Sequence, residues 1–280
     1  MQALPKATII IAVYNKVHYL RLLLAGLQRQ TVSGFELILA DDGSNPESVA
    51  EIEALIPTLP FPVTHLWQPD NGFQKNKIMN RAIAAARSEY LIFIDGDCIP
   101  HKCFVEEHLK NAGKGLVLNG RRVNLPEAIT NSLTEQKVLS GSLERIQLQL
   151  LISAWGKGQK EVFAERGFYI AQPWLQRLVN RKAKGLLGSN FSLFKADMLA
   201  INGFDERYVQ PSVGEDTDIE FRLRLLGMQF KTMKNVAVQY HLWHRLLPRP
   251  QENLDLYRQV EREGKAFTEY GIVKTDTAKG

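Results

Sequence analysis

The feature that most constrains the fold is an alternation of strand-like and helix-like segments through the first third of the chain. Short apolar, β-branched runs recur there, and leucines or alanines at helical spacing lie between them. The pattern predicts strands at 7–13, 35–40, 63–67 and 90–94, with helices at 17–30, 45–55 and 74–87. Such alternation is typical of βαβ units. It predicts an α/β protein with a mostly parallel central sheet flanked by helices.

The remainder of the chain is less regular. It predicts helices at 104–111, 127–152, 196–201, 217–226 and 253–267, and strands at 116–119, 191–194 and 236–240. We therefore divide the chain into a first half, 1–120, a second half of the same domain, 121–250, and a C-terminal helix with a tail, 251–280.

Composition narrows the class of protein. Of the 280 residues, 45% are hydrophobic and 23% are charged, which excludes a disordered chain and a polytopic membrane protein. No apolar run approaches the ~20 residues that cross a bilayer, and residues 1–6 lack the layout of a signal peptide. We therefore expect a cytoplasmic protein. Cys98 and Cys103 have no second pair to complete a zinc site, so both are predicted to be reduced thiols.

Acidic side chains stand where predicted strands end or a helix begins. Asp41-Asp42 follows the second strand, Asp95-Gly96-Asp97 follows the fourth, and Glu215-Asp216 opens a helix. In open α/β sheets, ligands bind beyond the carboxyl ends of the strands. Acidic groups gathered at one edge would repel one another unless a cation or polar ligand lay between them. The pattern therefore predicts a cation-dependent ligand site at this edge.

The tripeptide Asp95-Gly96-Asp97 is the most specific of these features. In an extended chain, residues i and i+2 point to the same side about 6–7 Å apart, so the two carboxylates can flank a hard divalent ion. Gly96 would let a phosphate or sugar approach the backbone. A structural turn is the alternative, but the buried strand that precedes the tripeptide favours a ligand site.

Glu215 and Asp216 lie in the first turn of a predicted helix. Acidic residues there commonly stabilise the helix dipole. The alternative is a general base, because the same field keeps a carboxylate ionised and fixed in direction. Ile219, Leu223 and Leu226 would anchor the opposite face of this helix.

Two histidines, His241 and His244, follow the last predicted strand. They are either structural, hydrogen-bonded side chains or metal ligands beside the acidic cluster. Trp243, which lies between them, is either a platform for a sugar or, like Trp155 and Trp174, a residue of the core.

Together these motifs resemble the family 2 glycosyltransferases of the GT-A fold, with its Rossmann-like sheet, over roughly residues 7–245. The motifs come in the family's order: IIIAVYN at 9–15, FELILADDGS at 35–44, NGFQ at 71–74 through NRAI at 80–83 to the acidic tripeptide, GSNF at 188–191, and NGFDERY at 202–208 before GED at 214–216. The later motifs look like those of bacterial chondroitin-polymerase-like and galactosyltransferase-like members.

The resemblance implies a role for each matched residue. The implied donor-binding residues are Ala12, Tyr14, Asn15, Asp42, Lys75, Asp95 and Gly96. The implied ligands of Mn²⁺ or Mg²⁺ are Asp97, Asp95 and His241. Asp216 stands at the position of the catalytic base, with Glu215 beside it. Met79 replaces an arginine that relatives often carry, and Lys75 could take over its contact with a diphosphate.

The implied activity is the metal-dependent, inverting transfer of a sugar from a nucleotide diphosphate sugar. The favoured donor is a UDP-hexose or UDP-N-acetylhexosamine, and the acceptor is a hydroxyl of a glycan, glycolipid or lipid-linked glycan in bacterial surface polysaccharide synthesis, of lipopolysaccharide or capsule. Residues 1–120 would bind the donor, and 121–250 would bind the acceptor and supply the base. A nucleotidyltransferase or phosphotransferase using the same acidic site, and a non-catalytic sugar-binding module, are the alternatives. No nucleic-acid partner is expected.

Positive charge is concentrated in one segment. The net charge of the chain is +5, and residues 151–188 hold seven basic and two acidic side chains. One interpretation is a solvated helix face. The other is an acceptor groove for an anionic glycolipid or lipid-diphosphate oligosaccharide at the cytoplasmic face of the inner membrane, because anionic lipid attracts lysine and arginine.

Overall fold

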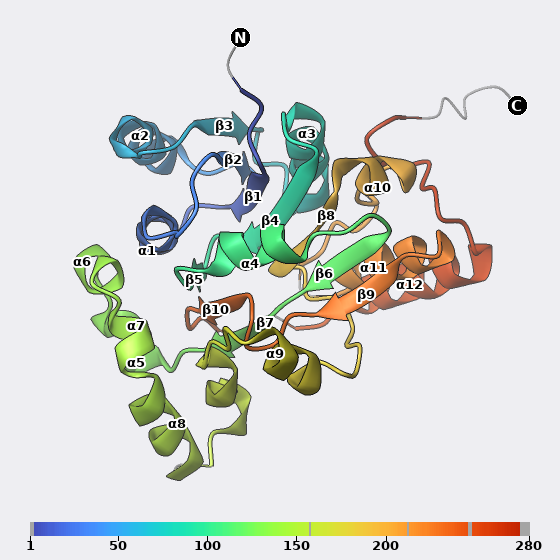
Figure 1. Cartoon of the computed structure of the whole chain (residues 1–280). Helices are drawn as coiled ribbons and strands as arrows, with labels where there is room; N and C mark the ends of the chain where they lie inside the picture. The colour runs from blue at the N-terminus through green and yellow to red at the C-terminus, as the bar shows by residue number, and fades with distance from the viewer. Residues whose placement is uncertain (1–2, 157, 212, 246–247, 275–280) are drawn as a thin grey trace, which may run out of the picture.

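A seven-stranded sheet lies at the centre of the computed structural model, which describes residues 3–156, 158–211, 213–245 and 248–274 (Figure 1). The strand order is β3–β2–β1–β4–β8–β6–β9. The strands are β1 (Thr8–Val13), β2 (Glu36–Asp41), β3 (Val63–Trp67), β4 (Tyr90–Asp95), β6 (Leu116–Asn119), β8 (Asn190–Phe194) and β9 (Gln229–Thr232). Only β8 runs antiparallel to its neighbours, β4 and β6. The predicted mostly parallel sheet is confirmed.

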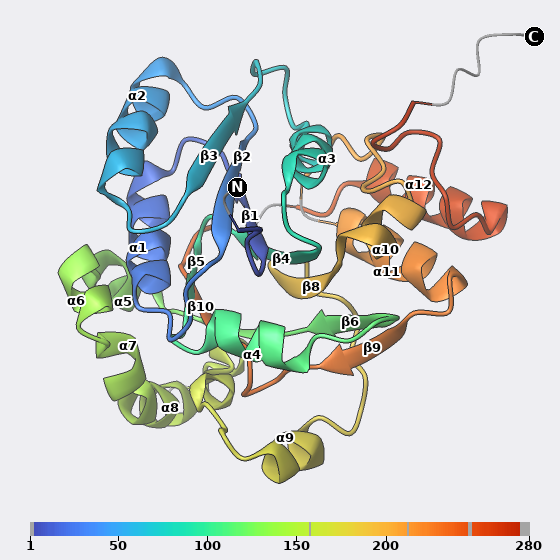
Figure 2. The same cartoon turned by 45° about the horizontal axis from the view of Figure 1, so that its top comes forward.

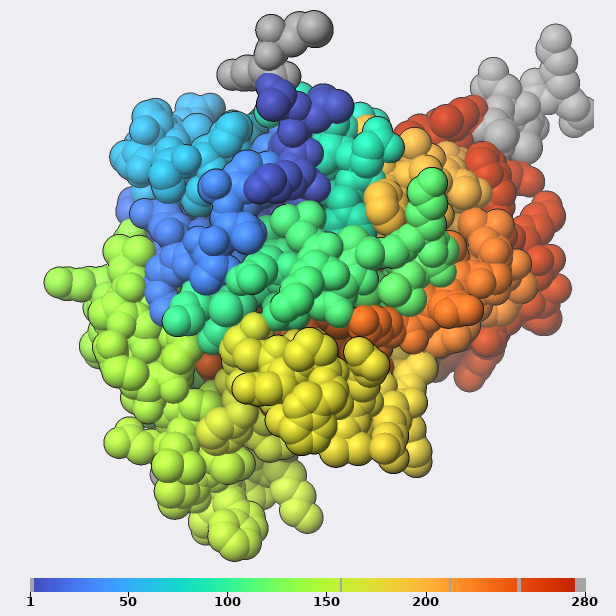
Figure 3. Space-filling view, viewed as in Figure 1, coloured from blue at the N-terminus to red at the C-terminus, as the bar shows by residue number. Residues whose placement is uncertain are grey.

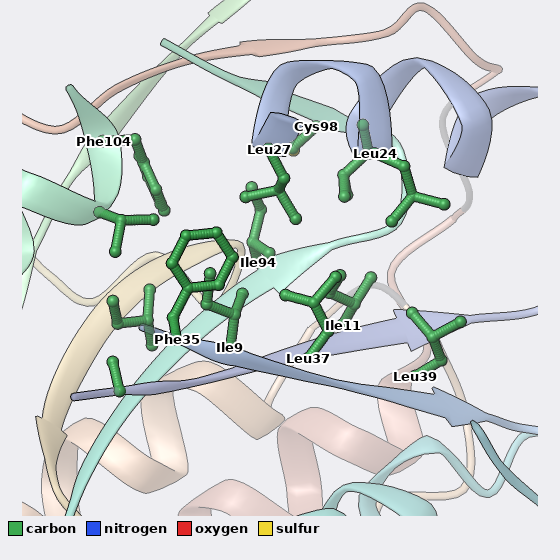
Figure 4. Packing of buried hydrophobic residues seen from close by; sticks show 14 of the residues in the cluster. Ile9, Ile11, Leu24, Leu27, Phe35, Leu37, Leu39, Ile94, Cys98 and Phe104 are labelled. Atoms are coloured by element: carbon green, nitrogen blue, oxygen red, sulfur yellow. The ribbon is translucent and has the colours of Figure 1, made fainter. Parts of the chain in front are cut away.

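Helices cover both faces of this sheet. They are α1 (Val17–Gln28), α2 (Pro46–Leu55), α3 (Lys75–Ala85), α4 (Phe104–Asn111), α10 (Lys195–Ala200) and α11 (Glu215–Leu225), with a 3-10 turn η1 (Ile56–Thr58) after α2. Side chains of β1 alternate between the faces, so that Ile9 and Ile11 pack in one apolar cluster and Ile10 in the other. The first cluster includes Leu24 and Leu27 of α1, which lie over the strands in Figure 4. The second cluster lies under α3, α10 and α11 (Figure 2).

A second, three-stranded sheet joins distant parts of the chain. It has the order β5–β10–β7 and consists of β5 (Cys98–Pro100), β7 (Arg121–Asn124) and β10 (Val238–His241). Cys98 pairs with His241 across β5 and β10. This pairing places the acidic tripeptide, which directly precedes β5, beside the C-terminal histidines. Strands β5, β7 and β9 were not predicted, because β5 has only three residues, and the sequences RRVN of β7 and QFKT of β9 contain no apolar run.

The long helix predicted at 127–152 is wrong. Four short helices replace it: α5 (Glu127–Ser132), α6 (Glu135–Leu139), α7 (Ser142–Arg145) and α8 (Gln147–Gly156). Thr134 adopts an extended conformation and caps α6 through its side chain, and Gly141 has a φ of 76° before α7. Both residues interrupt the helical hydrogen-bond ladder. After the four helices, the chain forms η2 (Lys160–Val162), η3 (Ala164–Gly167) and α9 (Pro173–Val179). The helix α9 was not predicted.

The C-terminal helix α12 (Gln251–Glu263) begins near the predicted position and ends earlier, where Gly264 adopts a left-handed φ of 61°. Residues 275–280 of the predicted tail lie outside the described residues.

No helix of the described part of the chain is both long enough and apolar enough to cross a membrane. Cys98 and Cys103 are free, as predicted. The interpretation of Trp155, Trp174 and Trp243 as residues of the hydrophobic core is wrong, because all three side chains are exposed.

Candidate active site

A cavity of about 400 Å³ opens at the carboxyl ends of β1, β2 and β4. The first half of the chain supplies nearly all of its walls. Its lining residues are Ala12, Val13, Tyr14, Lys16, Leu20, Ala40, Asp42, Asp70, Gly72, Phe73, Lys75, Asp95, Gly96, Asp97 and Pro211. Six of the seven predicted donor-binding residues are among them, together with the predicted metal ligand Asp97.

The seventh predicted donor-binding residue, Asn15, does not line the cavity but stabilises the backbone next to it. Its side-chain oxygen accepts a hydrogen bond from the backbone N–H of Asn45 at 2.8 Å, and its own N–H donates to Ser44 Oγ at 2.8 Å. Asn15 has a φ of 58°, in the left-handed region that asparagine tolerates better than most residues. Asn15 therefore fastens the end of β1 to the loop that follows β2.

Asp42 and Tyr14 form one wall of the cavity. The Asp42 carboxylate accepts hydrogen bonds from Gln68 Nε2 at 2.7 Å and from the Gln74 N–H at 2.9 Å. Burial, with the nearby charge of Asp70, raises the pKa of Asp42. The half-exposed ring of Tyr14 is held by its hydroxyl, which donates to Asp70 Oδ2 at 3.1 Å. A flat aromatic ring beside fixed polar groups can receive a planar ligand.

Gly96 is required by the backbone around it. A Cβ at this position would lie 2.7 Å from the carbonyl oxygen of Ala12, to which the Gly96 N–H donates at 3.1 Å. The close approach of the two strand ends therefore accounts for this glycine. The room for a ligand that the sequence suggested is not needed to explain it.

Lys75 connects the cavity to the second half of the chain. Its Nζ lies 3.3 Å from Asp95 Oδ1 and 3.3 Å from Glu215 Oε1. Burial disfavours the charged amine, but Asp95, Glu215 and Asp216 outweigh burial and raise the pKa of Lys75 well above its usual value. Burial raises the pKa of Glu215 to about 7 against the opposing effect of Lys75. One cation thus holds the acidic residues of β4 and α11 together.

Asp216 is fixed by a backbone group. Its Oδ2 accepts a hydrogen bond from the Gly188 N–H at 2.8 Å, and a Cβ on Gly188 would lie only 1.9 Å from its Oδ1. Burial and the charge of Asp95 raise the pKa of Asp216, while Lys75 lowers it. The carboxylate is therefore held in one direction and is close enough to Lys75 and Asp95 for their charges to act on it.

The helix that carries Asp216 is anchored by an ion pair that the sequence analysis did not identify. Asp218 and Arg222 are both 1% exposed and lie 2.9 Å apart, from Oδ2 to Nε. Arg222 also donates to the carbonyl oxygens of Ile201 and Gly203. Of the predicted apolar anchors, Ile219 and Leu223 are buried as expected. The prediction for Leu226 is wrong, because this residue lies beyond the end of α11 and is 44% exposed.

A metal-binding geometry forms where β10 ends. Asp97, His241 and His244 each offer a ligand atom, and these atoms lie within 4.8 Å of one another. Nε2 of His241 is 3.7 Å from Asp97 Oδ1, and Nε2 of His244 is 3.4 Å from Asp97 Oδ2. Asp95, also predicted as a ligand, pairs instead with Lys75.

The neutral form of His241 and the orientation of the His244 ring fit a metal ion. Burial, together with the charges of Arg122 and His244, lowers the pKa of His241 to about 3, so its ring is neutral. His244 donates from Nδ1 to the carbonyl oxygen of Arg245 at 3.0 Å, so in the neutral ring the Nε2 lone pair faces Asp97 and His241. Neutral imidazoles and a carboxylate are the forms that bind metals.

Two basic residues of the site, Lys16 and Arg122, were not predicted from the sequence. Lys16 lines the cavity, and Arg122 lies on β7, which pairs with the histidine-bearing β10. Both charges lower the pKa of Asp97 against the larger effects of burial and of Asp95, which raise it. Arg122 was hidden because the short strand that carries it was not predicted.

The chain matches known glycosyltransferases along its length. Residues 8–157 match the family model of glycosyl transferase family 2, and residues 177–245 match that of the N-terminal domain of galactosyltransferase. Chondroitin synthase of Escherichia coli is 26% identical over 242 residues, which cover 84% of this chain and 34% of that protein. Hyaluronan synthase of Pasteurella multocida is 24% identical and covers 84% of this chain and 24% of that protein. The chain thus spans about a third or less of these relatives.

Solved structures share the fold. Staphylococcus aureus TarS residues 1–349, in complex with UDP-GlcNAc, superposes with a TM-score of 0.55 at 16% identity and covers 92% of this chain and 66% of that one. A longer TarS structure gives a TM-score of 0.57 and the same 92% coverage of this chain, with 39% of its own. The predicted GT-A fold is confirmed by these neighbours, and the family model covers more than half of the sequence. The chain therefore belongs to glycosyltransferase family 2.

Proposed function

We propose that this glycosyltransferase moves a sugar from a UDP-sugar to a hydroxyl of a glycan or glycolipid, in a metal-dependent reaction that inverts the anomeric configuration. The observation that carries the proposal is the contact of Lys75 with both Asp95 and Glu215, because it joins the cavity of the first half to the acidic helix of the second. The relatives named for chondroitin and hyaluronan synthesis, and the TarS complexes with UDP and UDP-GlcNAc, support a nucleotide-sugar donor and a polysaccharide acceptor.

The donor would lie in the cavity at the strand ends. The ring of Tyr14 and the polar group of Asp42 would receive the base. The positive charges of Lys16 and Lys75, together with the metal site, would face the diphosphate. Lys75 compensates in this way for Met79, a buried residue that offers no charge.

Asp97, His241 and His244 would hold the divalent ion. A mixed set of oxygen and nitrogen ligands favours a first-row transition-metal ion such as Mn²⁺ over Mg²⁺, which prefers oxygen ligands. When bound, the ion supplies charge stabilisation for the departing nucleotide diphosphate. Asp95, which is held by Lys75, would contact the ribose or the diphosphate.

Asp216 would accept the proton of the acceptor hydroxyl. Gly188 occupies one carboxylate oxygen through its N–H, which leaves the other free to act as a general base. The acceptor oxygen then attacks the anomeric carbon from the face opposite the leaving group, and a single displacement inverts the configuration. No covalent intermediate with a carboxylate is needed.

The proposal is tested with UDP-glucose, UDP-galactose and their N-acetylated forms, assayed for release of UDP with Mn²⁺ and with chelator. We expect slow, metal-dependent hydrolysis of at least one donor, and faster release of UDP by transfer when a glycan or lipid-linked acceptor is added. Asp216→Asn should lower transfer by about 10²–10⁴-fold while donor binding is retained. Asp197→Asn is the matched control, because Asp197 also lies in the first turn of a helix, but Lys75 and Asp95 act on Asp216 and not on Asp197. Release of the sugar 1-phosphate in place of UDP would identify transfer of the nucleotidyl group and overturn the proposal.

A further inference from the structure

The outer face of α8 is apolar and exposed. Leu148, Ile152 and Trp155 follow one another at helical spacing and are 58%, 61% and 86% exposed. The opposite face of the same helix holds Gln147, Leu150 and Ala154, which are buried against the rest of the protein. An isolated apolar side chain on a surface needs no explanation, but a row of three that includes a nearly free tryptophan marks an interaction site.

The helix α9 has the same character. Trp174 and Leu178 lie one turn apart and are exposed, and none of the residues of α9 is buried. Both views place α8 and α9 at the end of the molecule opposite α2 and α3 (Figures 1 and 2). In the space-filling view the segment around α8 projects from this end (Figure 3).

Positive charge lies close in sequence to these apolar side chains, from Lys160 to Lys184. Lys160, Arg177, Arg181, Lys182 and Lys184 are exposed, and within the described ranges none of the five forms an ion pair. Glu161 and Glu165 are the acidic side chains of the segment, and Glu165 is paired with Arg166. Residues 148–184 therefore combine exposed tryptophan and leucine side chains with exposed cations.

We propose that Leu148, Ile152, Trp155, Trp174 and Leu178, with Arg177, Arg181 and Lys182, form a docking surface for an anionic lipid bilayer. Helices of 10 and 7 residues are too short to cross a membrane, so they would lie in its interface. Tryptophan prefers this zone, and the cationic side chains would meet the lipid phosphates. A partner of this chemistry matches both the apolar row and the charge around it.

Docking would bring the membrane close to the active site. Gln147 of α8 donates a hydrogen bond to the carbonyl oxygen of Ala164 in η3, and η3 packs on β7 and β10, which carry Arg122 and His241. The η3 turn thus contacts both α8 and the strands that carry Arg122 and His241. The inference goes beyond the proposed function, and vesicle binding is measured without donor or acceptor, so its failure would leave the transferase proposal standing.

The test is sedimentation with vesicles of phosphatidylcholine, with and without phosphatidylglycerol, at low and high salt. We expect binding to the anionic vesicles only, weakened by salt, with a blue shift of the tryptophan emission. The combined change Leu148→Ser, Ile152→Ser and Trp155→Ser should weaken binding at least about tenfold. Replacing Arg177, Arg181 and Lys182 by Gln should weaken it about fivefold for each charge removed.

The control variants change exposed apolar and basic residues elsewhere on the protein. Leu199→Ser with Leu226→Ser, and Gln at Lys6, Lys102 and Lys114, should bind vesicles as the wild type does. Far-UV circular dichroism establishes that each variant is folded. Absence of vesicle binding by the wild type, or equal binding to neutral vesicles, would overturn the proposal. So would self-association of the wild type in sedimentation velocity that the apolar variant abolishes, because a second copy would then cover this surface.

Discussion

The position of a single carboxylate depends here on a residue without a side chain. Gly188 donates its N–H to Asp216 Oδ2, and the space beside it is filled by the second oxygen of the same carboxylate. Lys75 acts on the same group from the other side through its charge. Direction and ionisation of Asp216 are therefore set by two residues that are distant in sequence.

Gly188→Ala should displace Asp216 without unfolding the protein. The new Cβ would lie 1.9 Å from Oδ1, and the end of a side chain can move aside at small cost. We expect kcat to fall by about 10²-fold or more, with the melting temperature and the Kd for UDP close to wild type. Gly113→Ala is the control, because its Cβ would make only an ordinary contact at 3.5 Å with Leu116. Unchanged kcat in Gly188→Ala would contradict the role of Asp216.

Lys75→Met should change the pH dependence of the reaction. The lysine charge lowers the pKa of Glu215 and Asp216. Its loss removes the largest effect that opposes burial, so both carboxylates would take up protons at higher pH. The acidic limb of the kcat profile should therefore move to higher pH, whereas Lys75→Arg should leave it near its wild-type position. A profile that does not move in Lys75→Met would show that the base lies elsewhere.

At the scale of single elements, α11 owes its position to the buried pair of Asp218 and Arg222. Arg222 satisfies the carboxylate and two backbone carbonyls at once, so its removal leaves several buried acceptors without donors. Glu215 and Asp216 of the first turn are thus held by contacts one and two turns further along the same helix.

Arg222→Met should lower the free energy of unfolding by about 3–5 kcal/mol, as for other broken buried pairs. Arg224 on the same helix pairs with Glu220 at the surface, and Arg224→Met should cost less than about 1 kcal/mol. Urea denaturation followed by circular dichroism measures both. Similar losses for the two variants would mean that the buried pair has no special importance.

The packing of α4 on the sheet depends on a neutral histidine. His108 is fully buried, its Nδ1 lies 2.7 Å from Ser192 Oγ on β8, and burial lowers its pKa to about 3. Because the unfolded chain binds the proton more readily, stability should fall as the pH drops below about 6.5. Urea denaturation between pH 7.5 and 5 should show this slope, and His108→Gln should reduce it. An unchanged slope in the variant would rule out His108 as its source.

At the scale of the whole molecule, local patterns predicted the sheet and its main helices well. The βαβ alternation and the turn after β2 are encoded by neighbours in sequence, so the first half of the chain could be predicted nearly element by element. The region of 127–188 could not, because its helices end at Thr134 and Gly141 and fold around the second sheet. Arg122 and the pairing of β5 with β10 depend on contacts across more than a hundred residues, which a local pattern does not record.

The architecture places three groups around one centre: the cavity at the strand ends, the cluster of Asp97 with His241 and His244, and Asp216 behind Lys75. The central claim is that one divalent ion, held by the cluster, joins the donor diphosphate to this centre.

Titration calorimetry of UDP against the protein, with Mn²⁺ and with chelator, tests this claim most directly. We expect UDP to bind tightly only with Mn²⁺, and His241→Ala with His244→Ala to abolish that difference while Asp216→Asn keeps it. UDP binding of equal strength with and without the metal, or undiminished in the double histidine variant, would contradict the account.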